Sequence, residues 1–333
     1  MAAIVMTTPG EPEVLAYQSV SRPDIQFPNQ VLVQIKAASV NPIDTKLRRR
    51  GMLLQPGQPA ILGCDGSGVV IACGSQVTRV RPGQAVYYCY GGLGGMTGSY
   101  AEYIVLPETA LAPKPQRLDF VEAAALPLVG ITAWEALYDR GQLQAGETVL
   151  IHAGAGGVGH VAIQLAKHRG AQVLTTVSSL EKGQFAQILG ADGVIYYRET
   201  DFAQAVQYQT QGKGVDLALD TVGGETFHQT PKAVRYYGRL VTLLQPPAQG
   251  AGWETARQRN LTIGYTLMLT PQTANLLEEQ IRQTGILEQL AALVDQGHLS
   301  VKVARTYPLT EAVAAHRQLE QGGFMGKLVL TIS

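Results

Sequence analysis

The stretch "HAGAGGVGHVAIQLAKHRG", which runs from His152 to Gly170, decides the fold of this chain. It places Gly154, Gly156 and Gly159 at the spacing G-x-G-x-x-G, a pattern that by itself is weak evidence for a dinucleotide site. Its context is stronger, because "ETVLIHA" before it has the pattern of a buried strand and the residues after it repeat apolar side chains at helical spacing. A strand, a glycine loop and a helix in this order predict a dinucleotide-binding unit; the alternative is a glycine-rich turn without a ligand.

Each glycine has an expected role in such a unit. Gly154 permits the tight turn, Gly156 lets the backbone approach a pyrophosphate, and Gly159 lets the helix pack closely on the strand. The helix that follows offers unpaired N–H groups and its positive dipole end to phosphates. Gly170 stands where the residue after a helix end belongs.

The two sides of this stretch have different patterns. Up to about Ala125, short strands such as Gln30–Val40 are bounded by turn residues, which predicts a small β-barrel. From about Leu126, strands alternate with helices, which predicts a doubly wound parallel sheet of six strands. We therefore expect an α/β fold with a barrel domain over residues 1–125, a Rossmann domain over 126–268, and a return to the first domain over 269–333.

Composition narrows the class of protein. The 333 residues are 46% hydrophobic and 16% charged, which suits buried cores, and the formal net charge of zero argues against nucleic acid and membrane surfaces as partners. Three cysteines do not make a disulfide framework and fit a reducing compartment. The first residues lack the basic start of a signal peptide, and no apolar run is long enough to span a bilayer. We expect a cytoplasmic enzyme.

The end of the second strand of the expected sheet indicates which dinucleotide binds. NAD-binding units usually place a carboxylate there, which accepts from the ribose 2′-hydroxyl, but "TTVSSLEK" has none at that point. Ser178 can hydrogen-bond a 2′-phosphate, and Lys182 can neutralise it. Glu181 argues against a bound 2′-phosphate, although an acidic residue is also favourable at a helix start. The sequence predicts NADPH; the alternative for Lys182 is a solvated surface lysine.

Several segments of the chain resemble those of a known family. The chain is similar to the zinc-independent medium-chain dehydrogenase/reductases, in the quinone oxidoreductase (zeta-crystallin-like) branch, with similarity to the enone oxidoreductases. The resemblance covers nearly the full chain and rests on these segments: "AASVNPIDTKLRRRG", "ILGCDGSGVV", "GSYAEY", "AAALPLVGITAWEAL", "VLIHAGAGGVGHVAIQLAKHRGA", "GADGVIYYRE", "DLALDTVGGETF" and "GKLVL". It implies a GroES-like β domain, a Rossmann domain with NADPH in the cleft, and a homodimer built by sheet continuation, for which "LTIGYTLM" is the candidate edge.

The resemblance also implies which residues contact the cofactor. Ser178, Lys182 and Tyr197 would hold the 2′-phosphate; without the family, Tyr197 reads equally well as a tyrosine at the edge of the core. Thr132 would approach the nicotinamide carboxamide. The glycine loop would line the pyrophosphate and the last strand would close the pocket, through Gly154, Gly156, Gly157, Val158, Gly159, Gly326 and Lys327.

Zinc ligands are missing where zinc alcohol dehydrogenases of this superfamily carry them. The first position reads Val40-Asn41, the second reads Cys64-Asp65 without histidine, and only Cys89 stands where a four-cysteine lobe would be. We therefore expect no metal and regard Cys64 as a small buried hydrophobe. Without a Lewis acid, the favoured chemistry is hydride transfer from NADPH to an electron-poor acceptor.

The segment "SVNPIDTKLRRRG" holds the candidate catalytic residues. Asn41 and Asp44 have the pattern of a helix start, so a purely structural role is as plausible as a place beside the nicotinamide ribose. Lys46 resembles the lysine of "N-P-x-D-x-K" in enone oxidoreductases and could relay a proton to an enolate; the alternative is a surface lysine that steers an anionic cofactor. The run Arg48–Arg50 reads as a solvated loop face.

Together these patterns predict an NADPH-dependent reductase of a small-molecule electrophile. Quinones are the first expected acceptors, and the double bonds of α,β-unsaturated carbonyls are the alternative. A different class, an NADPH-binding structural or RNA-binding protein with little turnover, remains open because one fold can host both. Zero net charge and the lack of a basic stripe weigh against RNA.

Overall fold

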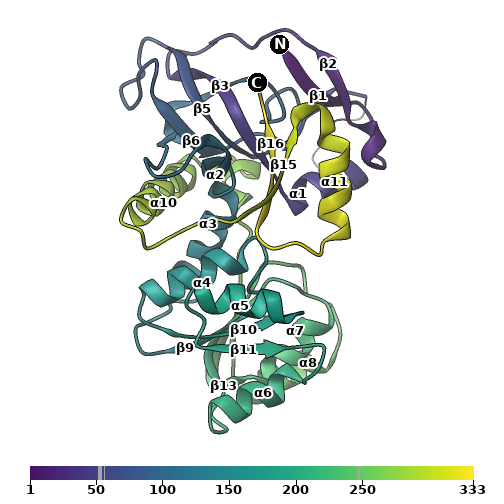
Figure 1. The fold of residues 1–333 in the computed structure, drawn as a ribbon, viewed down its shortest axis with the longest axis vertical. Coiled ribbons are helices and arrows are strands. Elements are labelled where there is room, and N and C mark those ends of the chain that lie inside the picture. Colours follow the sequence, from purple (N-terminus) through teal and green to yellow (C-terminus); the bar gives the residue numbers. More distant parts are fainter. Residues whose placement is uncertain (52–54, 56, 247) are drawn as a thin grey trace. The chain divides into compact units, whose positions relative to one another are not determined.

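The computed structural model describes residues 1–51, 55, 57–246 and 248–333 (Figure 1). The chain forms two compact units. Unit 1 comprises Met1–Leu128 and Leu269–Ser333, and unit 2 is the continuous segment Val129–Met268. Among the described residues, no helix combines the length and the apolar character needed to cross a membrane.

Unit 1 is built from β-strands with helices at its margins. A three-stranded sheet has the order β2-β1-β4, and a seven-stranded sheet has the order β15-β16-β3-β5-β6-β8, with β7 paired to β3. The strands are β1 (Ala2–Met6), β2 (Ala16–Ser19), β3 (Gln30–Val40), β4 (Ala60–Ile61), β5 (Asp65–Cys73), β6 (Ala85–Cys89), β7 (Tyr103–Pro107), β8 (Ala112–Pro113), β15 (Val303–Pro308) and β16 (Lys327–Thr331). The helices are η1 (Pro12–Val14), α1 (Pro42–Arg50), η2 (Glu108–Ala110), α2 (Phe120–Ala124), α9 (Thr270–Thr273), α10 (Leu277–Asp295), η5 (Leu309–Glu311) and α11 (Ala312–Gln321), and α3 (Pro127–Trp134) begins here.

Strand β3 is the centre of the larger sheet. It has the predicted bounds and pairs antiparallel with β5, β7 and β16. The alternating sequence of β3 predicts one exposed face, but only Gln30, Gln34 and Lys36 are even half-buried and the other side chains of the strand are buried. The difference arises because β3 contributes to two core clusters, with Val33 and Ile35 in one and Ala37 in the other, which a two-residue period cannot reveal.

Unit 2 contains the predicted six-stranded sheet, with all strands parallel and in the order β11-β10-β9-β12-β13-β14. Helices α4 and α5 lie on one face of it and α6 and α8 on the other (Figure 1). The strands are β9 (Thr148–Ile151), β10 (Gln172–Val177), β11 (Gly193–Tyr196), β12 (Val215–Asp220), β13 (Val234–Thr242) and β14 (Thr262–Tyr265). The helices are η3 (Glu135–Arg140), α4 (Gly159–His168), α5 (Leu180–Ile188), α6 (Phe202–Gln209), α7 (Glu225–Gln229), η4 (Thr230–Lys232) and α8 (Ala251–Gln258).

Helix α4 follows the glycine loop as the sequence predicts. Its apolar residues Val161, Ala162 and Leu165 are at most 1% exposed, which is the burial that their helical spacing indicates. Gly170 adopts φ +82°, the left-handed conformation that commonly follows a helix end. Strand order 3-2-1-4-5-6 makes β9 and β12 the central strands, so the loop after β9 lies where the winding of the sheet reverses.

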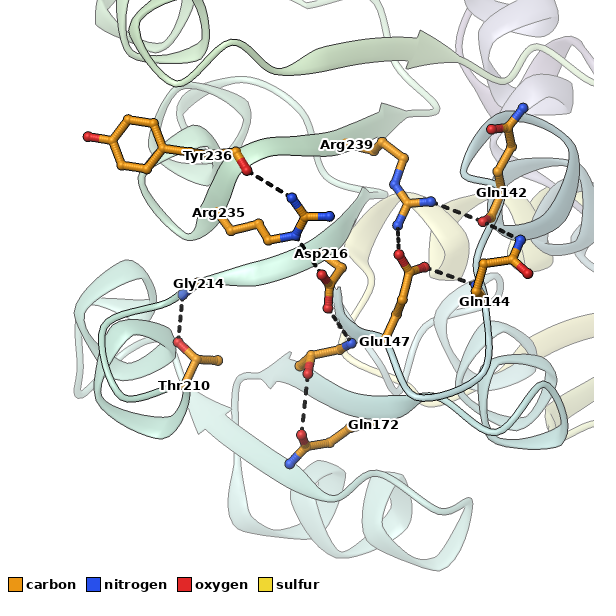
Figure 2. Close-up of polar contacts among 11 residues, drawn as sticks. Gln142, Gln144, Glu147, Gln172, Thr210, Gly214, Asp216, Arg235, Tyr236 and Arg239 are labelled. Carbon is orange, nitrogen blue, oxygen red and sulfur yellow. Dashed lines mark hydrogen bonds and ion pairs between the residues drawn. The ribbon is translucent and has the colours of Figure 1, made fainter.

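A polar network joins the amino ends of the strands in unit 2 (Figure 2). The carboxylate of Asp216 accepts from the Thr148 backbone N–H at 2.8 Å and from Arg235 Nε at 2.6 Å. These hydrogen bonds lower the pKa of Asp216 in spite of its partial burial, which by itself raises it. Glu147 accepts from the Arg239 guanidinium at 2.5 Å, so β9 is tied to β12 and β13 at the edge opposite the glycine loop.

Candidate functional site

The loop between β9 and α4 owes its shape to close packing. A Cβ on Gly159 would lie 2.2 Å from the Ala153 carbonyl oxygen and 2.8 Å from Gly154 Cα, so only glycine lets the helix start this close to the turn. Gly154 does not take a left-handed conformation; Ala153 does, with φ +52°. The role predicted for Gly154 is therefore corrected: its missing side chain makes room for Thr175, whose Oγ1 would lie 2.0 Å from a Cβ.

The backbone of this loop leaves hydrogen-bond donors free. In the part of the chain that the structure describes, the N–H groups of Gly157 and Val158 donate to no acceptor. Gly156 is less tightly enclosed than Gly154 or Gly159, although a Cβ there would still lie only 3.1 Å from the Ala153 carbonyl oxygen. Its own carbonyl accepts from the His160 backbone N–H at 3.1 Å and faces His160 Nδ1 at 2.8 Å. Free N–H groups at the start of α4 fit a pyrophosphate, since the helix dipole adds positive potential there.

The buried side chain of His152 holds the start of the glycine loop against the neighbouring elements. His152 Nδ1 lies 3.2 Å from Thr176 Oγ1, and its Nε2 lies 3.0 Å from Thr230 Oγ1. Burial lowers the pKa of His152 to about 4, although the nearby Asp220 opposes this shift. The ring is therefore neutral at physiological pH and acts as a fixed bridge between β9, β10 and η4.

Two adjacent strand ends bring together the residues expected to bind a 2′-phosphate. Val177 pairs in register with Tyr196, and the Tyr197 N–H donates to the Val177 carbonyl at 3.2 Å. Ser178 and Tyr197 are thus neighbours at the carboxyl edge of the sheet, each one residue beyond its strand. Tyr197 is 49% exposed, so much of its side chain is accessible to a ligand.

The side chains of Ser178 and Lys182 are available to a ligand. Both residues are half-buried, and neither side chain pairs with another residue of the described ranges. Ser179 caps α5 through its hydroxyl, which accepts from the Lys182 backbone N–H at 3.5 Å. Glu181 is exposed in the first turn of α5, where a carboxylate suits the helix dipole. The remaining cofactor candidate of unit 2, Thr132, is buried in α3 at 6% exposure.

Unit 1 holds a buried polar cluster made of Ser39, Asn41, Asp44, Asp65 and Lys327. The Asn41 carboxamide joins its two charged ends: Nδ2 donates to Asp65 Oδ2 at 2.9 Å, and Oδ1 accepts from the Lys327 ammonium. Asp65 also accepts from Ser39 Oγ at 2.6 Å. Burial raises the pKa of Asp65, and Lys327 and these hydrogen bonds oppose the rise. The cluster brings together three predicted residues, Asn41 and Asp44 from the start of α1 and Lys327 from β16.

Asp44 lies at the other side of the same cluster. Its Oδ2 accepts from the Asn41 backbone N–H at 2.8 Å and from Tyr100 Oη at 3.1 Å, whereas its Oδ1 is buried without a partner among the described residues. Tyr100 Oη also lies 3.2 Å from His316 Nε2. Burial and the nearby Asp65 carboxylate raise the pKa of Asp44 to about 7. Asn41 and Asp44 therefore form the predicted helix start and are at the same time parts of the polar cluster.

The remaining candidates of unit 1 differ in their surroundings. Lys46 is half-buried on α1, and its ammonium pairs with none of the residues that the structure describes. Gly326 adopts φ +80°, and a Cβ there would lie 2.1 Å from the Lys302 carbonyl oxygen, so it shapes the chain just before β16. Cys64 is wholly buried, as expected.

The interpretation of Arg48–Arg50 as a solvated loop face is wrong for Arg48. These residues form the last turn of α1, and the Arg48 side chain is 0% exposed. Its guanidinium donates to the Gly10 carbonyl and forms an ion pair with Glu320 of α11. The sequence did not reveal the burial of Arg48 because it lies in a run of charged residues, which are usually exposed, as Arg49 and Arg50 are.

No group of three or more His, Cys, Asp or Glu residues within the described ranges has a geometry that could hold a metal ion. Asp65 and Cys89, which stand in the regions where zinc alcohol dehydrogenases carry their zinc ligands, are paired across β5 and β6. A positive charge is nevertheless present in the cluster, as the ammonium of Lys327.

Known proteins match both units. Residues 27–116 match the model described as "Alcohol dehydrogenase GroES-like domain", and residues 189–330 match "Zinc-binding dehydrogenase". A quinone oxidoreductase of Pseudomonas aeruginosa is 35% identical over 96% of this chain and 96% of its own, and a 2-haloacrylate reductase of a Burkholderia species is 33% identical over 91% of each. The crystal structure of Escherichia coli quinone oxidoreductase complexed with NADPH superposes with a TM-score of 0.87 at 31% identity, over 99% of this chain and 100% of that one.

A GroES-like domain followed by a six-stranded parallel sheet of the Rossmann type defines a medium-chain dehydrogenase/reductase, which confirms the predicted fold class. The chain belongs to the quinone oxidoreductase family of that superfamily.

Proposed function

We propose that this protein is an NADPH-dependent reductase that transfers a hydride to quinones without a metal or a flavin. The observation that carries the proposal is the edge of the sheet in unit 2 where β10 and β11 end and α5 begins. There the polar side-chain groups of Ser178, Lys182 and Tyr197 pair with no other described residue. These groups suit a 2′-phosphate, which NADPH has and NADH lacks. Relatives named quinone oxidoreductases support the choice of acceptor.

The residues of the chain divide the work of holding the cofactor. NADPH supplies the hydride when it is bound. The N–H groups of Gly157 and Val158 hold the pyrophosphate, and Lys182 neutralises the 2′-phosphate while Ser178 and Tyr197 donate to it. Thr132 is assigned to the nicotinamide carboxamide. These groups bind and orient, and orientation is the main contribution that such a site makes to the rate.

Lys182→Ala is expected to weaken NADPH binding by about 10-fold, since a half-buried charge-assisted contact contributes about 1.5 kcal/mol. NADH binding should stay within about 2-fold, because NADH has no 2′-phosphate. The measurement is the dissociation constant of each nucleotide by fluorescence titration. Lys232→Ala, an exposed lysine of η4, is the control and should change neither constant. Equal weakening for both nucleotides would contradict the assignment of Lys182 to the 2′-phosphate.

A second candidate function is the reduction of α,β-unsaturated carbonyl compounds. The Burkholderia relative named 2-haloacrylate reductase favours it, as does the unpaired ammonium of Lys46 on α1. This reaction differs from quinone reduction in that a proton must reach the α-carbon. Lys46 is the residue of this chain to which we assign that proton, with solvent as the alternative source.

The two functions are separated by NADPH oxidation with 9,10-phenanthrenequinone and with a simple alkenal in parallel, each repeated with NADH. Faster quinone turnover supports the first proposal and makes Lys46 incidental. Faster alkenal turnover supports the second, and Lys46→Ala should then lower kcat more than NADPH affinity. Turnover with NADH equal to that with NADPH would overturn the choice of cofactor, and no turnover with either acceptor would favour a nucleotide-binding protein that is not an enzyme.

A further inference from the structure

The ammonium of Lys327 is a buried cation without a contact ion pair. Lys327 is 4% exposed, and its Nζ donates to Asn41 Oδ1 and, at 3.4 Å, to the Val40 carbonyl. Both acceptors are neutral oxygens. Among the described residues no carboxylate oxygen lies within 4.0 Å of Nζ. An ammonium has three N–H donors, so one remains without an acceptor in the protein.

The carboxylate of Asp65 is satisfied by other donors. Asp65 accepts from Ser39 Oγ, from Asn41 Nδ2 and, at 2.8 Å, from the Leu128 backbone N–H at the start of α3. Asp65 therefore stabilises the ammonium through the Asn41 carboxamide and through space, and it does not occupy the remaining N–H of Lys327. A buried charge with a free donor is costly unless a ligand oxygen completes its shell.

We propose that Lys327 donates this N–H to the carbonyl oxygen of the electrophile, where it stabilises the negative charge that forms as the hydride adds; this inference rests on the proposed function. The hydride adds to the carbonyl carbon and forms a C–H bond there, while the carbonyl π pair moves onto the oxygen beside Lys327. Water protonates this oxygen, and transfer of the C–H proton through water to the second carbonyl oxygen then gives the hydroquinone. The ammonium keeps its three hydrogens throughout. Lys327 thus supplies at this oxygen the positive charge that a Lewis acid supplies in metal-dependent relatives.

Asn41 and Asp65 are positioning residues in this arrangement. The orientation of the Asn41 carboxamide is fixed, because its oxygen accepts from the Lys327 ammonium and its nitrogen donates to the Asp65 carboxylate. Reversing the amide would bring its NH₂ group against the ammonium and its oxygen against Asp65. The direction of the free N–H of Lys327 is therefore set by a chain of buried hydrogen bonds, which is the preorganisation that electrostatic catalysis requires.

The first test needs no variant. Burial lowers the pKa of Lys327, while the facing groups Asp65, Asp44, Cys89 and Cys64 oppose the shift. The ammonium is charged below its pKa, so kcat for the quinone should fall as pH rises through a value below that of an exposed lysine. A kcat that stays constant up to the pH range of ordinary lysines would overturn the proposal.

The second test compares variants. Lys327→Met should lower kcat for the quinone by about 100-fold or more, the effect of losing one donor to a developing oxyanion. The NADPH dissociation constant should change by less than about 3-fold, since the proposed partner is the acceptor and not the cofactor. Weaker NADPH binding with an unchanged kcat would instead assign the free N–H to an oxygen of the cofactor and overturn the proposal.

A paired variant separates catalysis from stability. Lys327→Met leaves Asp44 and Asp65 without their cation, so it is expected to lower the melting temperature of the protein. Asp44→Asn removes one of these charges, and the amide fits because Asp44 Oδ1 has no partner to lose. The double variant Lys327→Met/Asp44→Asn should recover the melting temperature but should stay about 100-fold below Asp44→Asn in kcat. Recovery of kcat together with stability would show that Lys327 is only structural.

Two controls complete the experiment. Lys114→Met removes a half-buried lysine of unit 1 that is also held by backbone carbonyls, at Pro115 and Leu118, and kcat should not change. The unmodified protein must oxidise NADPH with the quinone. Its failure to do so would count against the proposed function, whereas an active protein whose kcat is unaffected by Lys327→Met would count against this inference alone.

Discussion

Gly159→Ala is expected to weaken NADPH binding by about 100-fold, because two charge-assisted hydrogen bonds to phosphate contribute roughly 3 kcal/mol together. The new Cβ would lie 2.2 Å from the Ala153 carbonyl oxygen and 2.8 Å from Gly154 Cα. Both obstacles are backbone atoms, so the loop and the start of α4 must move apart. The free N–H groups of Gly157 and Val158 would move with them.

The control for this prediction is Gly285→Ala in α10. A Cβ at Gly285 meets nothing within 4 Å, so alanine should raise the free energy of unfolding by about 0.5–1 kcal/mol and leave NADPH binding unchanged. The measurements are the NADPH dissociation constant by fluorescence titration and the melting temperature of each variant. If Gly159→Ala binds NADPH as well as the parent does, the loop after β9 is not the phosphate site.

Arg48→Met is expected to lower the free energy of unfolding by about 3–5 kcal/mol, the cost of removing one partner of a buried ion pair. The Arg48 guanidinium is wholly buried and links α1 to Glu320 on α11 and to the Gly10 carbonyl. Its loss leaves Glu320, whose side chain is only 17% exposed, with the exposed Arg49 as its remaining partner at 3.0 Å.

Arg50→Met provides the comparison, since it lies on the same helix with its side chain in solvent. Its free energy of unfolding should change by no more than about 0.5 kcal/mol. Urea denaturation of the two variants and the parent measures the difference. Similar stability of Arg48→Met and Arg50→Met would mean that the buried guanidinium contributes no net stability to unit 1.

Local patterns predicted unit 2 well. Strands β9 to β14 and helix α4 follow from apolar runs, helical spacing and glycine positions, all of which act over a few residues. The proximity of Ser178 and Tyr197 also follows, because the ends of adjacent parallel strands meet at one edge. The π-helical turn Glu135–Arg140 and strand β15 were not predicted, since neither has a local signal that distinguishes it.

The polar cluster of unit 1 was predicted only in part. Asn41, Asp44 and Lys327 were named, but their mutual contact was not, because Asn41 and Lys327 are 286 positions apart. Ser39 and Asp65 were missed as members, and so was the contact of Tyr100 with Asp44. The burial of Arg48 was also missed, because Glu320, whose carboxylate compensates the buried guanidinium, lies far along the chain on α11. Pairings of this kind depend on tertiary packing, which spacing in the sequence does not encode.

The antiparallel pairing of β16 with β3 has a consequence for synthesis. Leu328 pairs with Val40, so the carboxyl end of β3, the central strand of the larger sheet, waits for a partner that is synthesised much later than β3 itself. At roughly 5–20 residues per second, the 286 residues between Asn41 and Lys327 take about 15–60 s to synthesise. Unit 2 is continuous and can fold on the ribosome during that interval, while β3 presents an open edge to other nascent chains. The same five residues that close this edge deliver the ammonium, so protection from misassembly and completion of the polar cluster occur together.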